Sequence, residues 1–572
     1  MERIISVSDG AEAFIELLNA NAVDYLFLNP GTDTFSVQEA VAKYKTLGKR
    51  TPEVILCLDE SIAMAAAHGY FMVTGKPQVI LVHADLGPQQ IGGALHNAQR
   101  GRIAVVLCAG KVASDTERSR LNQVHWLQEQ FDQAGVVRGY VKWEYELRTN
   151  DNIHEVVQRA FQVASSEPCG PVFLSLPQVL LAEKMTEVRI PDPARHAGVV
   201  TPQADNDALV EVADLLLKAE NPLIITGYSG RHLQSVKHLI ELAETVSTRV
   251  VSSQVNMNFP TVHPLYGGFE SSPYIAKADV ILVIDEDVPY VPSQVKPQPG
   301  TKIIHIDIDA VKNNMPLWGF PVDFLLEADS SKMLPVLSRI IQQKITPEIK
   351  ARLQSRLQQL QSEHSQMKEK WLQMATNKAG EKPISPEWLC YCVNNAIDQE
   401  TILLEEALTN RPAFMRQIQR TIPGTLFRSG GSNLGWGLEA ALGAKLASPE
   451  KLVVAMVGDG CFVFGCPTAT LWAASVNQAP FLCIIFNNAQ YTAPRMIHRQ
   501  VFGTQSYCEQ TGLWVGTHIK PSPDYAAVAQ ACNAYGQKVE EPAELPAALK
   551  AAIEQVRCGK PAVLDVRVSS PF

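Results

Sequence analysis

The stretch that decides the fold begins with Gly458-Asp459-Gly460 and, after 26 further residues, ends with Asn487-Asn488. A hydrophobic run, 452–457, leads into the first motif, and a second run, 481–486, leads into the Asn pair. Continuous apolar runs of this length are typical of parallel strands buried on both faces of a sheet. We expect the residues between them to form one crossover helix, which brings both motifs to the same edge of the sheet.

The carboxyl edge of an open α/β sheet is where such folds bind ligands. Asp459 and Asn488 would lie side by side there and offer the oxygen ligands that Mg²⁺ prefers, with waters and phosphate oxygens completing its shell. Gly458 and Gly460 would let backbone N–H groups approach a diphosphate closely. The alternative is an ordinary Asp-Gly turn and an ordinary Asn-Asn loop. The order of the two motifs after two buried strands favours the diphosphate site.

Composition excludes several functional classes. A chain of 572 residues, 46 % hydrophobic and 19 % charged, predicts a globular protein of three or four domains. The net charge of −9 and the lack of a dense Lys/Arg stripe argue against a nucleic-acid partner. No apolar segment is long enough to span a membrane, and no signal peptide opens the chain. The 11 cysteines lack metal-site spacing and several lie in apolar runs, which suits a cytoplasmic protein.

Apolar strands alternate with helical patterns along most of the chain, which predicts an α/β fold of three doubly wound parallel-sheet domains. We place an amino-terminal domain at 1–187 and a central domain at 198–342, with Ile190–Pro193 as a linker between them. Residues 343–382 are polar and rich in Gln, Lys and Glu, and are predicted to form a long exposed linker helix. The domain that carries the diphosphate motif then occupies 383–572.

The block order and these motifs resemble the decarboxylase branch of the thiamine diphosphate enzymes, which includes benzoylformate decarboxylase, pyruvate decarboxylase and acetolactate synthase. The match covers nearly the whole chain. It implies that the amino-terminal domain binds the aminopyrimidine of thiamine diphosphate, that the central domain is structural, and that the carboxy-terminal domain binds the diphosphate through Mg²⁺. It also implies a homodimer or homotetramer with active sites at the subunit interface.

The resemblance assigns a catalytic role to Glu60. The family has a Glu after the second strand of the pyrimidine-binding domain, and Glu60 follows the run 54–58 here. A protonated carboxyl at that position donates to the pyrimidine ring and makes the cofactor basic enough to activate itself. Burial would raise its pKa and help it hold that proton. The alternative is an exposed Glu that caps the following helix.

The resemblance also implies the remaining cofactor contacts. Leu434 takes the place of the bulky apolar side chain beneath the thiazolium, with simple packing as the alternative. Gln490 would complete the Mg²⁺ shell through its backbone carbonyl, beside Asp459 and Asn488. Further contacts are expected from Thr409, Ser432, Cys461 and Tyr491.

Two residues after amino-terminal strands are candidates for contact with the substrate. His83 matches an active-site histidine of benzoylformate decarboxylase and could shuttle protons, although a structural histidine is the alternative. Thr32 could hold a substrate carboxylate or simply stabilise its turn. The loop 285–293 lacks both the second histidine of that enzyme and the Arg-containing flavin motif of acetolactate synthases, so FAD is not predicted. Arg495 and His498 could line the pocket or face solvent.

The resemblance predicts C–C bond cleavage or formation on small 2-oxo acids. Decarboxylation would give an enamine that is either released as an aldehyde or ligated to a second carbonyl, as in acyloin or acetolactate formation. One alternative is a lyase of 2-hydroxy ketones or 2-hydroxyacyl thioesters. Another is a catalytically silent structural subunit that still binds the cofactor, against which the intact Glu60, Asp459 and Asn488 argue. The fold alone does not choose between these reactions.

Overall fold

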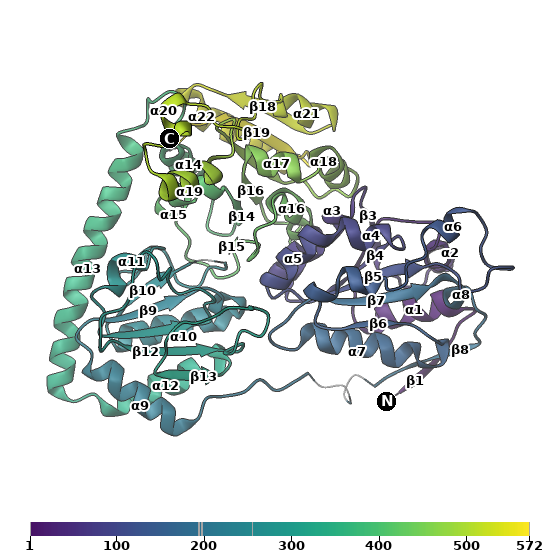
Figure 1. Ribbon diagram of the computed structural model, residues 1–572, viewed down its shortest axis with the longest axis horizontal. Coiled ribbons are helices and arrows are strands. Elements are labelled where there is room, and N and C mark those ends of the chain that lie inside the picture. The colour runs from purple at the N-terminus through teal and green to yellow at the C-terminus, as the bar shows by residue number, and fades with distance from the viewer. Residues whose placement is uncertain (1, 193–194, 196–197, 254, 571–572) are drawn as a thin grey trace.

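Figure 1 shows the computed structural model of the protein, in which residues 2–192, 195, 198–253 and 255–570 are described. Three parallel sheets with helices on both faces follow one another along the chain, as predicted. Within the described residues, no helix has both the length and the apolarity needed to cross a membrane.

The amino-terminal domain is built on a parallel sheet of order β3-β2-β4-β5-β7-β6. Its strands are β2 Tyr25–Leu28, β3 Glu53–Leu56, β4 Gln78–Val82, β5 Val105–Lys111, β6 Glu144–Glu146 and β7 Val172–Pro177. Its helices are α1 Gly10–Ala20, α2 Phe35–Thr46, α3 Glu60–Thr74, α4 Leu86–Gln90, α5 Gly92–Arg100, α6 Val124–Leu127, α7 Ile153–Ser165 and α8 Gln178–Leu181. A separate antiparallel pair joins β1 Arg3–Ser6 to β8 Glu187–Ile190, so the ordered contacts of this domain reach Ile190. Pro193 of the predicted linker lies outside the described residues.

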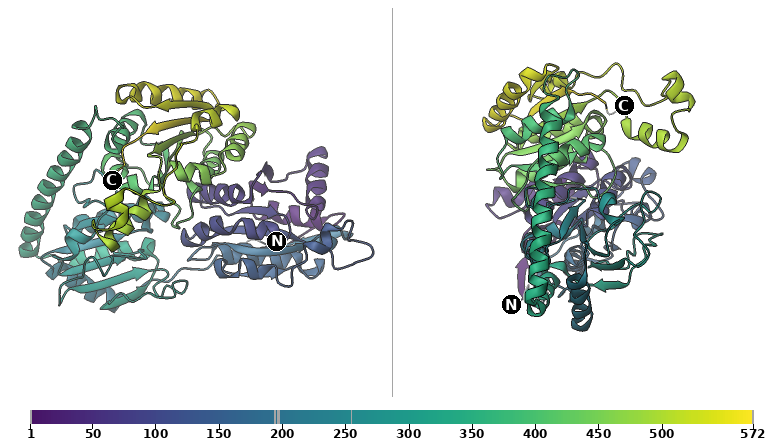
Figure 2. Two further views of the ribbon diagram at one scale, coloured as in Figure 1. Left: turned by 45° about the horizontal axis from the view of Figure 1, so that its top comes forward. Right: turned by 90° about the vertical axis from the view of Figure 1, so that its left-hand side faces the viewer.

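The central domain has a smaller parallel sheet of order β10-β9-β11-β12-β13. Its strands are β9 Pro222–Thr226, β10 Arg249–Ser252, β11 Val280–Ile284, β12 Lys302–Asp307 and β13 Phe324–Glu327. Its helices are α9 Asn206–Lys218, α10 Leu233–Thr245, α11 Ser272–Ile275 and α12 Ser330–Lys344. The predicted linker helix is α13, Pro347–Thr376, which runs along one side of the molecule from the central to the carboxy-terminal domain (Figures 1 and 2).

The carboxy-terminal sheet has the order β15-β14-β16-β17-β19-β18. Its strands are β14 Ile402–Glu406, β15 Leu426–Phe427, β16 Val453–Gly458, β17 Leu482–Asn487, β18 Tyr535–Val539 and β19 Ala562–Arg567. Its helices are α14 Pro386–Ala396, α15 Arg411–Gln417, α16 Trp436–Ala447, α17 Asp459–Phe464, α18 Pro467–Val476, α19 Thr492–Phe502, α20 Tyr507–Thr511, α21 Tyr525–Ala531 and α22 Leu545–Arg557.

The two strands that flank the diphosphate motif are parallel neighbours, as predicted, with Gly458 opposite Phe486. The expectation of one crossover helix between them is wrong, because α17 and α18 divide that segment. The break falls at Cys466, which has a left-handed backbone with φ of 43°, and Pro467 then begins α18. Proline is favoured in the first turn of a helix and disfavoured in its interior, which explains the division.

Helices α3 and α16 pack tightly together and join the amino-terminal domain to the carboxy-terminal domain. A Cβ atom added to Gly69 would lie 2.2 Å from the carbonyl oxygen of Ala440, and one added to Gly443 would lie 1.7 Å from that of Ala66. Glycine is therefore required at both positions for the helices to approach this closely. This packing holds the first turn of α3, which begins at Glu60, in a fixed place.

Candidate active site

Each sheet has one position where ligands are expected from topology alone. Numbered within its own domain, the amino-terminal and carboxy-terminal sheets both have the order 2-1-3-4-6-5, and the central sheet has 2-1-3-4-5. The chain leaves the first and third strands in opposite directions, which opens a crevice at their carboxyl ends. We call this position the switch point. It lies between β2 and β4, between β9 and β11, and between β14 and β16 in the three domains.

The carboxy-terminal switch point opens into a small cavity of about 50 Å³. It is lined by loops that follow β14, β15, β16 and β17. Nine residues predicted from the sequence are among the lining residues, namely Thr409, Leu434, Gly458, Asp459, Gly460, Cys461, Asn488, Gln490 and Tyr491. Ser432 is not among them, because its exposed hydroxyl lies 3.4 Å from Nε2 of His96 on α5. Its predicted contact with the cofactor stays a prediction.

Asp459 is a buried carboxylate, 4 % exposed, at the end of β16. Its Oδ1 accepts a hydrogen bond from Gly460 N at 2.8 Å and its Oδ2 accepts one from Ala489 N at 2.6 Å. Within the described part of the chain, no Lys, Arg or His side chain forms an ion pair with it. Because a buried charge is costly unless it is paired or bound to a metal, this carboxylate fits a cation.

The neighbouring oxygens complete a donor set of the kind that Mg²⁺ takes. Asn488 is 8 % exposed, and its side-chain nitrogen donates to Thr492 Oγ1 at 3.1 Å, which fixes the amide in the loop after β17. The side chain of Gln490 donates to the hydroxyl oxygen of Ser570. Among the described residues no cluster of three or more His, Cys, Asp or Glu is arranged to hold a metal, so a cation here would rely on amide and carbonyl oxygens beside one carboxylate.

The loop that carries Leu434 is held by a residue that sequence reasoning missed. Glu406, at the end of β14, accepts hydrogen bonds from the backbone N–H groups of Gly435 at 2.9 Å and Gly437 at 2.8 Å. Burial raises the pKa of Glu406 to about 8. Gly435 has φ of 99°, and a Cβ atom there would lie 2.7 Å from the backbone of Phe464. These contacts fix Leu434 at the wall of the cavity.

The amino-terminal domain carries a second cluster around Glu60. Glu60 is the first residue of α3 and is half-buried. Burial raises its pKa, and a side-chain hydrogen bond with Asn29, after β2, partly opposes that rise. The predicted direction of the Glu60 pKa is thus the one the structure gives. Asn29 is a further neighbour that the sequence pattern did not single out.

His83 lies at the amino-terminal switch point, directly after β4. Its Nδ1 forms a hydrogen bond with Oδ1 of Asp33, a residue from the loop after β2 that is only 2 % exposed. That bond raises the pKa of His83, while burial opposes the rise. The other ring nitrogen faces the side-chain amide of Gln128. Neither Asp33 nor Gln128 was predicted, although Asp33 directly follows the candidate Thr32.

Thr32 contacts a different histidine, His125, which is buried. Its Oγ1 lies 3.3 Å from Nε2 of His125, which is 1 % exposed. Nδ1 of His125 accepts a hydrogen bond from Leu121 N at 3.1 Å, so Nε2 carries the proton of the neutral ring and donates to Thr32. His125 was missed because nothing in the sequence around it marks a site. The role of Thr32 as an anchor for a substrate carboxylate stays a prediction.

The two clusters lie on different domains and do not share a cavity. The residues that line the carboxy-terminal cavity all fall between 407 and 494, whereas Glu60, His83 and their neighbours all precede residue 129. Large apolar side chains are exposed in both domains. They include Leu121, Trp126, Leu127 and Phe131 in the loop after β5, and Ile497, Val501, Phe502, Leu513 and Val515 in the segment 492–515. This segment, which contains α19 and α20, extends away from the body of the molecule (Figure 2).

Arg495 and His498 belong to the internal packing of this extended segment. Arg495 is 5 % exposed, donates from Nε to Thr517 Oγ1 at 2.9 Å, and lies over the ring of Trp514 at 5.1 Å. The ring of His498 packs between Phe502 and Trp514. Neither residue lines the cavity.

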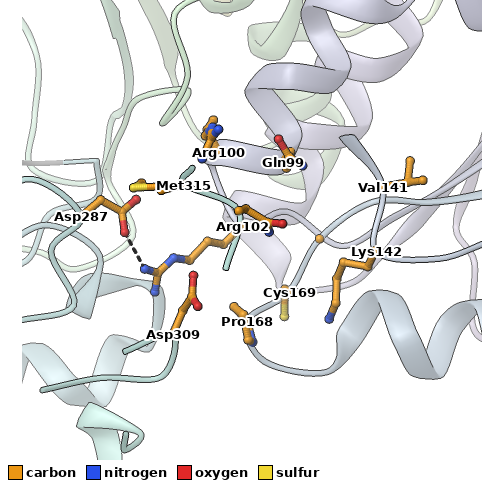
Figure 3. Close-up of a pocket in the computed structure, with 12 residues that line it drawn as sticks. Gln99, Arg100, Arg102, Val141, Lys142, Pro168, Cys169, Asp287, Asp309 and Met315 are labelled. Carbon is orange, nitrogen blue, oxygen red and sulfur yellow. Dashed lines mark hydrogen bonds and ion pairs between the residues drawn. The ribbon is translucent and has the colours of Figure 1, made fainter. Parts of the chain in front are cut away.

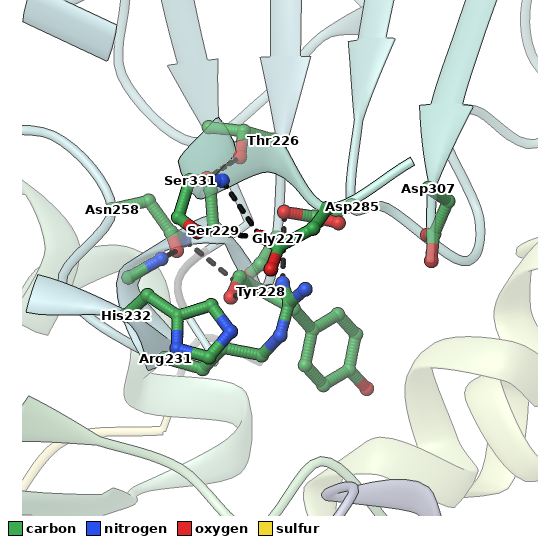
Figure 4. Close-up of polar contacts among 12 residues, drawn as sticks. Thr226, Gly227, Tyr228, Ser229, Arg231, His232, Asn258, Asp285, Asp307 and Ser331 are labelled. Atoms are coloured by element: carbon green, nitrogen blue, oxygen red, sulfur yellow. Dashed lines mark hydrogen bonds and ion pairs between the residues drawn. The ribbon is translucent and has the colours of Figure 1, made fainter. Parts of the chain in front are cut away.

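The central switch point is filled by an ion pair (Figure 4). Arg231, after β9, lies 2.8 Å from Asp285, which follows β11 and is fully buried. Arg231 also reaches Glu167 of the amino-terminal domain at 3.2 Å. The predicted absence of FAD stays a prediction, but protein side chains occupy the position where this sheet would bind a ligand.

A second ion cluster joins the amino-terminal and central domains beside a cavity of about 270 Å³ (Figure 3). Arg102 binds Asp287 at 2.9 Å and Asp307 at 3.0 Å, and Lys312 binds the same two carboxylates. These charges satisfy one another, so the cluster serves to fix the two domains together.

Comparison with known proteins identifies the class of protein. Residues 8–136 match the N-terminal TPP binding domain of thiamine pyrophosphate enzymes, 209–326 match their central domain, and 410–566 match their C-terminal TPP binding domain. The chain therefore belongs to the thiamine pyrophosphate enzyme family, and the resemblance drawn from the sequence is confirmed.

Individual relatives are similar along their whole length but distant. Benzoylformate decarboxylase of Pseudomonas aeruginosa is 24 % identical over 97 % of this chain and 98 % of its own. Acetolactate synthase of Bacillus subtilis is 25 % identical over 98 % of this chain and 93 % of its own. The solved 4-hydroxybenzoylformate decarboxylase of Rhodococcus jostii superposes with a TM-score of 0.79 at 22 % identity, covering 98 % of this chain and 99 % of that one. These relatives are thus decarboxylases and an acetolactate synthase.

Proposed function

We propose that the protein is a thiamine diphosphate- and Mg²⁺-dependent enzyme that decarboxylates a small 2-oxo acid. The observation that carries this proposal is the cavity around Asp459. There a buried carboxylate with no ion-pair partner among the described residues, an amide oxygen and closely approaching backbone meet at a switch point. Asp459, Asn488 and the carbonyl of Gln490 would hold Mg²⁺, and Gly458 and Gly460, which have no side chains, would let the diphosphate lie close to the backbone. When bound, thiamine diphosphate supplies the nucleophilic carbon and the electron sink that decarboxylation needs.

The amino-terminal cluster would manage protons. Glu60, with its raised pKa, would hold a proton toward the aminopyrimidine ring. His83, protonated to higher pH through its bond with Asp33, would present a proton to the substrate side of the site. This donor supports release of an aldehyde as the outcome after CO₂ leaves, with ligation to a second carbonyl as the competing outcome.

We also propose that the active site forms between two protomers. Support comes from the separation of the two clusters on different domains and from the apolar side chains exposed in both domains. A second copy of the chain would bring Glu60 opposite the Asp459 cavity and cover those side chains, giving a homodimer or a homotetramer. All 11 cysteines are described, and none of them forms a disulfide bond. Free cysteines are typical of the reducing cytoplasm, so this observation supports a cytoplasmic location.

The test is a substrate panel. The purified enzyme with Mg²⁺ and thiamine diphosphate is incubated with aliphatic and aromatic 2-oxo acids, including pyruvate and benzoylformate, and CO₂, aldehyde and acyloin are measured separately. We expect CO₂ and aldehyde from at least one acid, and neither product from Asp459→Ala. No CO₂ from any acid would overturn the proposal. In that case cleavage of a 2-hydroxy ketone or a 2-hydroxyacyl thioester would identify a lyase, and cofactor binding without any turnover would identify a silent subunit.

Subunit exchange tests the assembly. Glu60→Gln and Asp459→Ala chains are each inactive in the proposal, but a mixed dimer contains one site with both native halves. Equal mixing after reversible dissociation should therefore restore about a quarter of the native activity, because half of the dimers are mixed and each has one good site of two. No recovery from a mixture shown to contain mixed dimers would contradict a site shared between protomers.

A further inference from the structure

The pair formed by Asp33 and His83 is built into the fold from two sides. Asp33 directs Oδ1 to His83 Nδ1, and its Oδ2 accepts a hydrogen bond from Ala84 N at 2.9 Å. Both carboxylate oxygens are therefore used, and the side chain has one orientation. Since a carboxylate only accepts hydrogen bonds, Nδ1 of His83 must carry a proton.

Two glycines leave the space that this pair occupies. A Cβ atom added to Gly31 would lie 1.9 Å from Nδ1 of His83, and one added to Gly110, in β5, would lie 1.6 Å from Oδ2 of Asp33. Neither glycine has a left-handed backbone that would itself require glycine. The close approach of the Asp33 and His83 side chains is the reason that these positions need glycine.

The second ring nitrogen of His83 is left for chemistry. Because Nδ1 is protonated, Nε2 is the position that gains or loses a proton. It faces the amide of Gln128, whose Oε1 is buried without a hydrogen-bond partner in the described structure. The amide nitrogen can donate to the neutral ring, and after rotation the amide oxygen can accept from the charged ring. Gln128 thus accommodates both protonation states.

We propose that Asp33 is a positioning residue that fixes the tautomer and orientation of His83, so that Nε2 is the proton-transfer atom of the pyrimidine half of the site. The inference deepens the proposed function and rests on it for the role of His83. The charged groups that act on the His83 ring are Asp33, Glu60 and Asp85. Of these three, Asp33 is the one that forms a hydrogen bond with the ring. The Asp85 carboxylate instead accepts hydrogen bonds from Gln89 and Gln130.

The experiment compares Asp33→Asn with Asp85→Asn. Each change removes one negative charge near His83, but only the first removes its hydrogen-bond acceptor. The titration of His83 is followed by NMR in the full-length holoenzyme with ¹³Cε1-labelled histidine, and the signal is assigned by its loss in His83→Asn. Asp33→Asn is expected to lower the pKa of His83 by at least one unit, and Asp85→Asn by a few tenths. Equal shifts, or no shift in Asp33→Asn, would overturn the proposal.

Kinetics supply the second readout. With a 2-oxo acid that the enzyme turns over, Asp33→Asn should lower kcat at least tenfold with little change in KM and move the pH profile to lower pH. Asp33→Glu keeps the carboxylate, so its pH profile should lie closer to that of the native protein than the profile of Asp33→Asn does. In the His83→Asn background, Asp33→Asn should have no further effect, whereas an additive loss would overturn a role through His83. If Asp33→Asn does not fold, Asp33→Ser replaces it. If no 2-oxo acid is turned over, the proposed function fails while the NMR titration still decides the positioning role.

Discussion

The amino-terminal and carboxy-terminal sheets share one strand order, but their switch points hold opposite chemistry. Between β2 and β4 the crevice holds a carboxylate–imidazole pair, Asp33 and His83. Between β14 and β16 it opens into a cavity whose buried carboxylate, Asp459, has no cationic partner among the described residues. In the proposed function the first crevice would move protons and the second would hold a cation. Strand order thus decides where a site forms, and the loops that follow the strands decide what it does.

The central domain extends the comparison, because its switch point is closed. Arg231 and Asp285 fill it and neutralise each other. One topology therefore carries a carboxylate–imidazole pair, a cavity with a buried carboxylate, and an ion pair that joins domains.

The strongest test of the comparison separates cofactor binding from proton transfer. Glu60→Gln should lower kcat by about 10²–10⁴-fold while the affinity for thiamine diphosphate changes little, because a general acid is lost and the diphosphate cavity is intact. Asp459→Ala should instead lower the Mg²⁺-dependent affinity about 100-fold or more. Calorimetric titration and steady-state kinetics measure the two effects. Weak cofactor binding in Glu60→Gln with normal binding in Asp459→Ala would reverse the assignment.

The central ion pair should matter for stability and not for chemistry. Asp285→Asn leaves Arg231 buried with Glu167 as its remaining partner and should cost about 3 kcal/mol of unfolding free energy. The folded variant should keep its kcat and cofactor affinity within twofold. Urea unfolding and activity assays check this prediction. A selective loss of activity in fully folded protein would mean that the central switch point takes part in the reaction.

The space around Asp33 provides the next test. Gly110→Ala would place a methyl group against Oδ2 of Asp33 and should reduce kcat about 100-fold, since a shift of about 1 Å in a reacting group has an effect of that size. The control is Gly139→Ala, where an added Cβ atom meets nothing within 4 Å. Similar activity in the two variants would show that the Asp33 position tolerates movement.

The smallest expected effect is on stability and concerns the contact between the amino-terminal and carboxy-terminal domains. His68 on α3 is fully buried against Trp436, and its ring nitrogens have no hydrogen-bond partner among the described residues. Burial lowers its pKa to about 3. Because the folded-state pKa lies below the unfolded value of 6.5, stability is fully present above pH 6.5 and is lost as pH falls toward 3. The loss is about 1 kcal/mol between pH 6.5 and 5.5 and approaches about 1.4 kcal/mol per pH unit below that. In His68→Leu, the unfolding free energy measured with urea should therefore change less between pH 6.5 and 5.5 than in the native protein. The control is His238→Leu, which removes a histidine paired with Glu241 and should keep the native pH dependence.

The sequence was most informative where a strand leads directly into a motif. The apolar runs before Gly458 and Asn488 predicted two adjacent parallel strands, and nine predicted residues line one cavity. Glu60 was singled out by the family resemblance, which places a Glu after the second strand, and the structure places it at the start of α3. In these places local pattern and tertiary position coincide.

Prediction failed where a contact joins distant loops or where a local signal was overlooked. Asp33 and His83 are 50 residues apart, and Gln128 comes from a third loop, so no spacing rule connects them. Glu406 acts by holding backbone N–H groups of another loop, which leaves no mark in the sequence. The division into α17 and α18 was different, because Pro467 is a helix-start signal that the expectation of one helix ignored.

The extended segment with α19 and α20 has a practical consequence for anyone handling the protein. A single protomer exposes Ile497, Val501 and Phe502 to water. Exposed apolar patches of this kind favour aggregation and adsorption to surfaces. In the proposed assembly, diluted protein should lose activity with time, and recovery on reconcentration should follow second-order kinetics. Stock concentration and preincubation time therefore belong among the controlled variables of any assay.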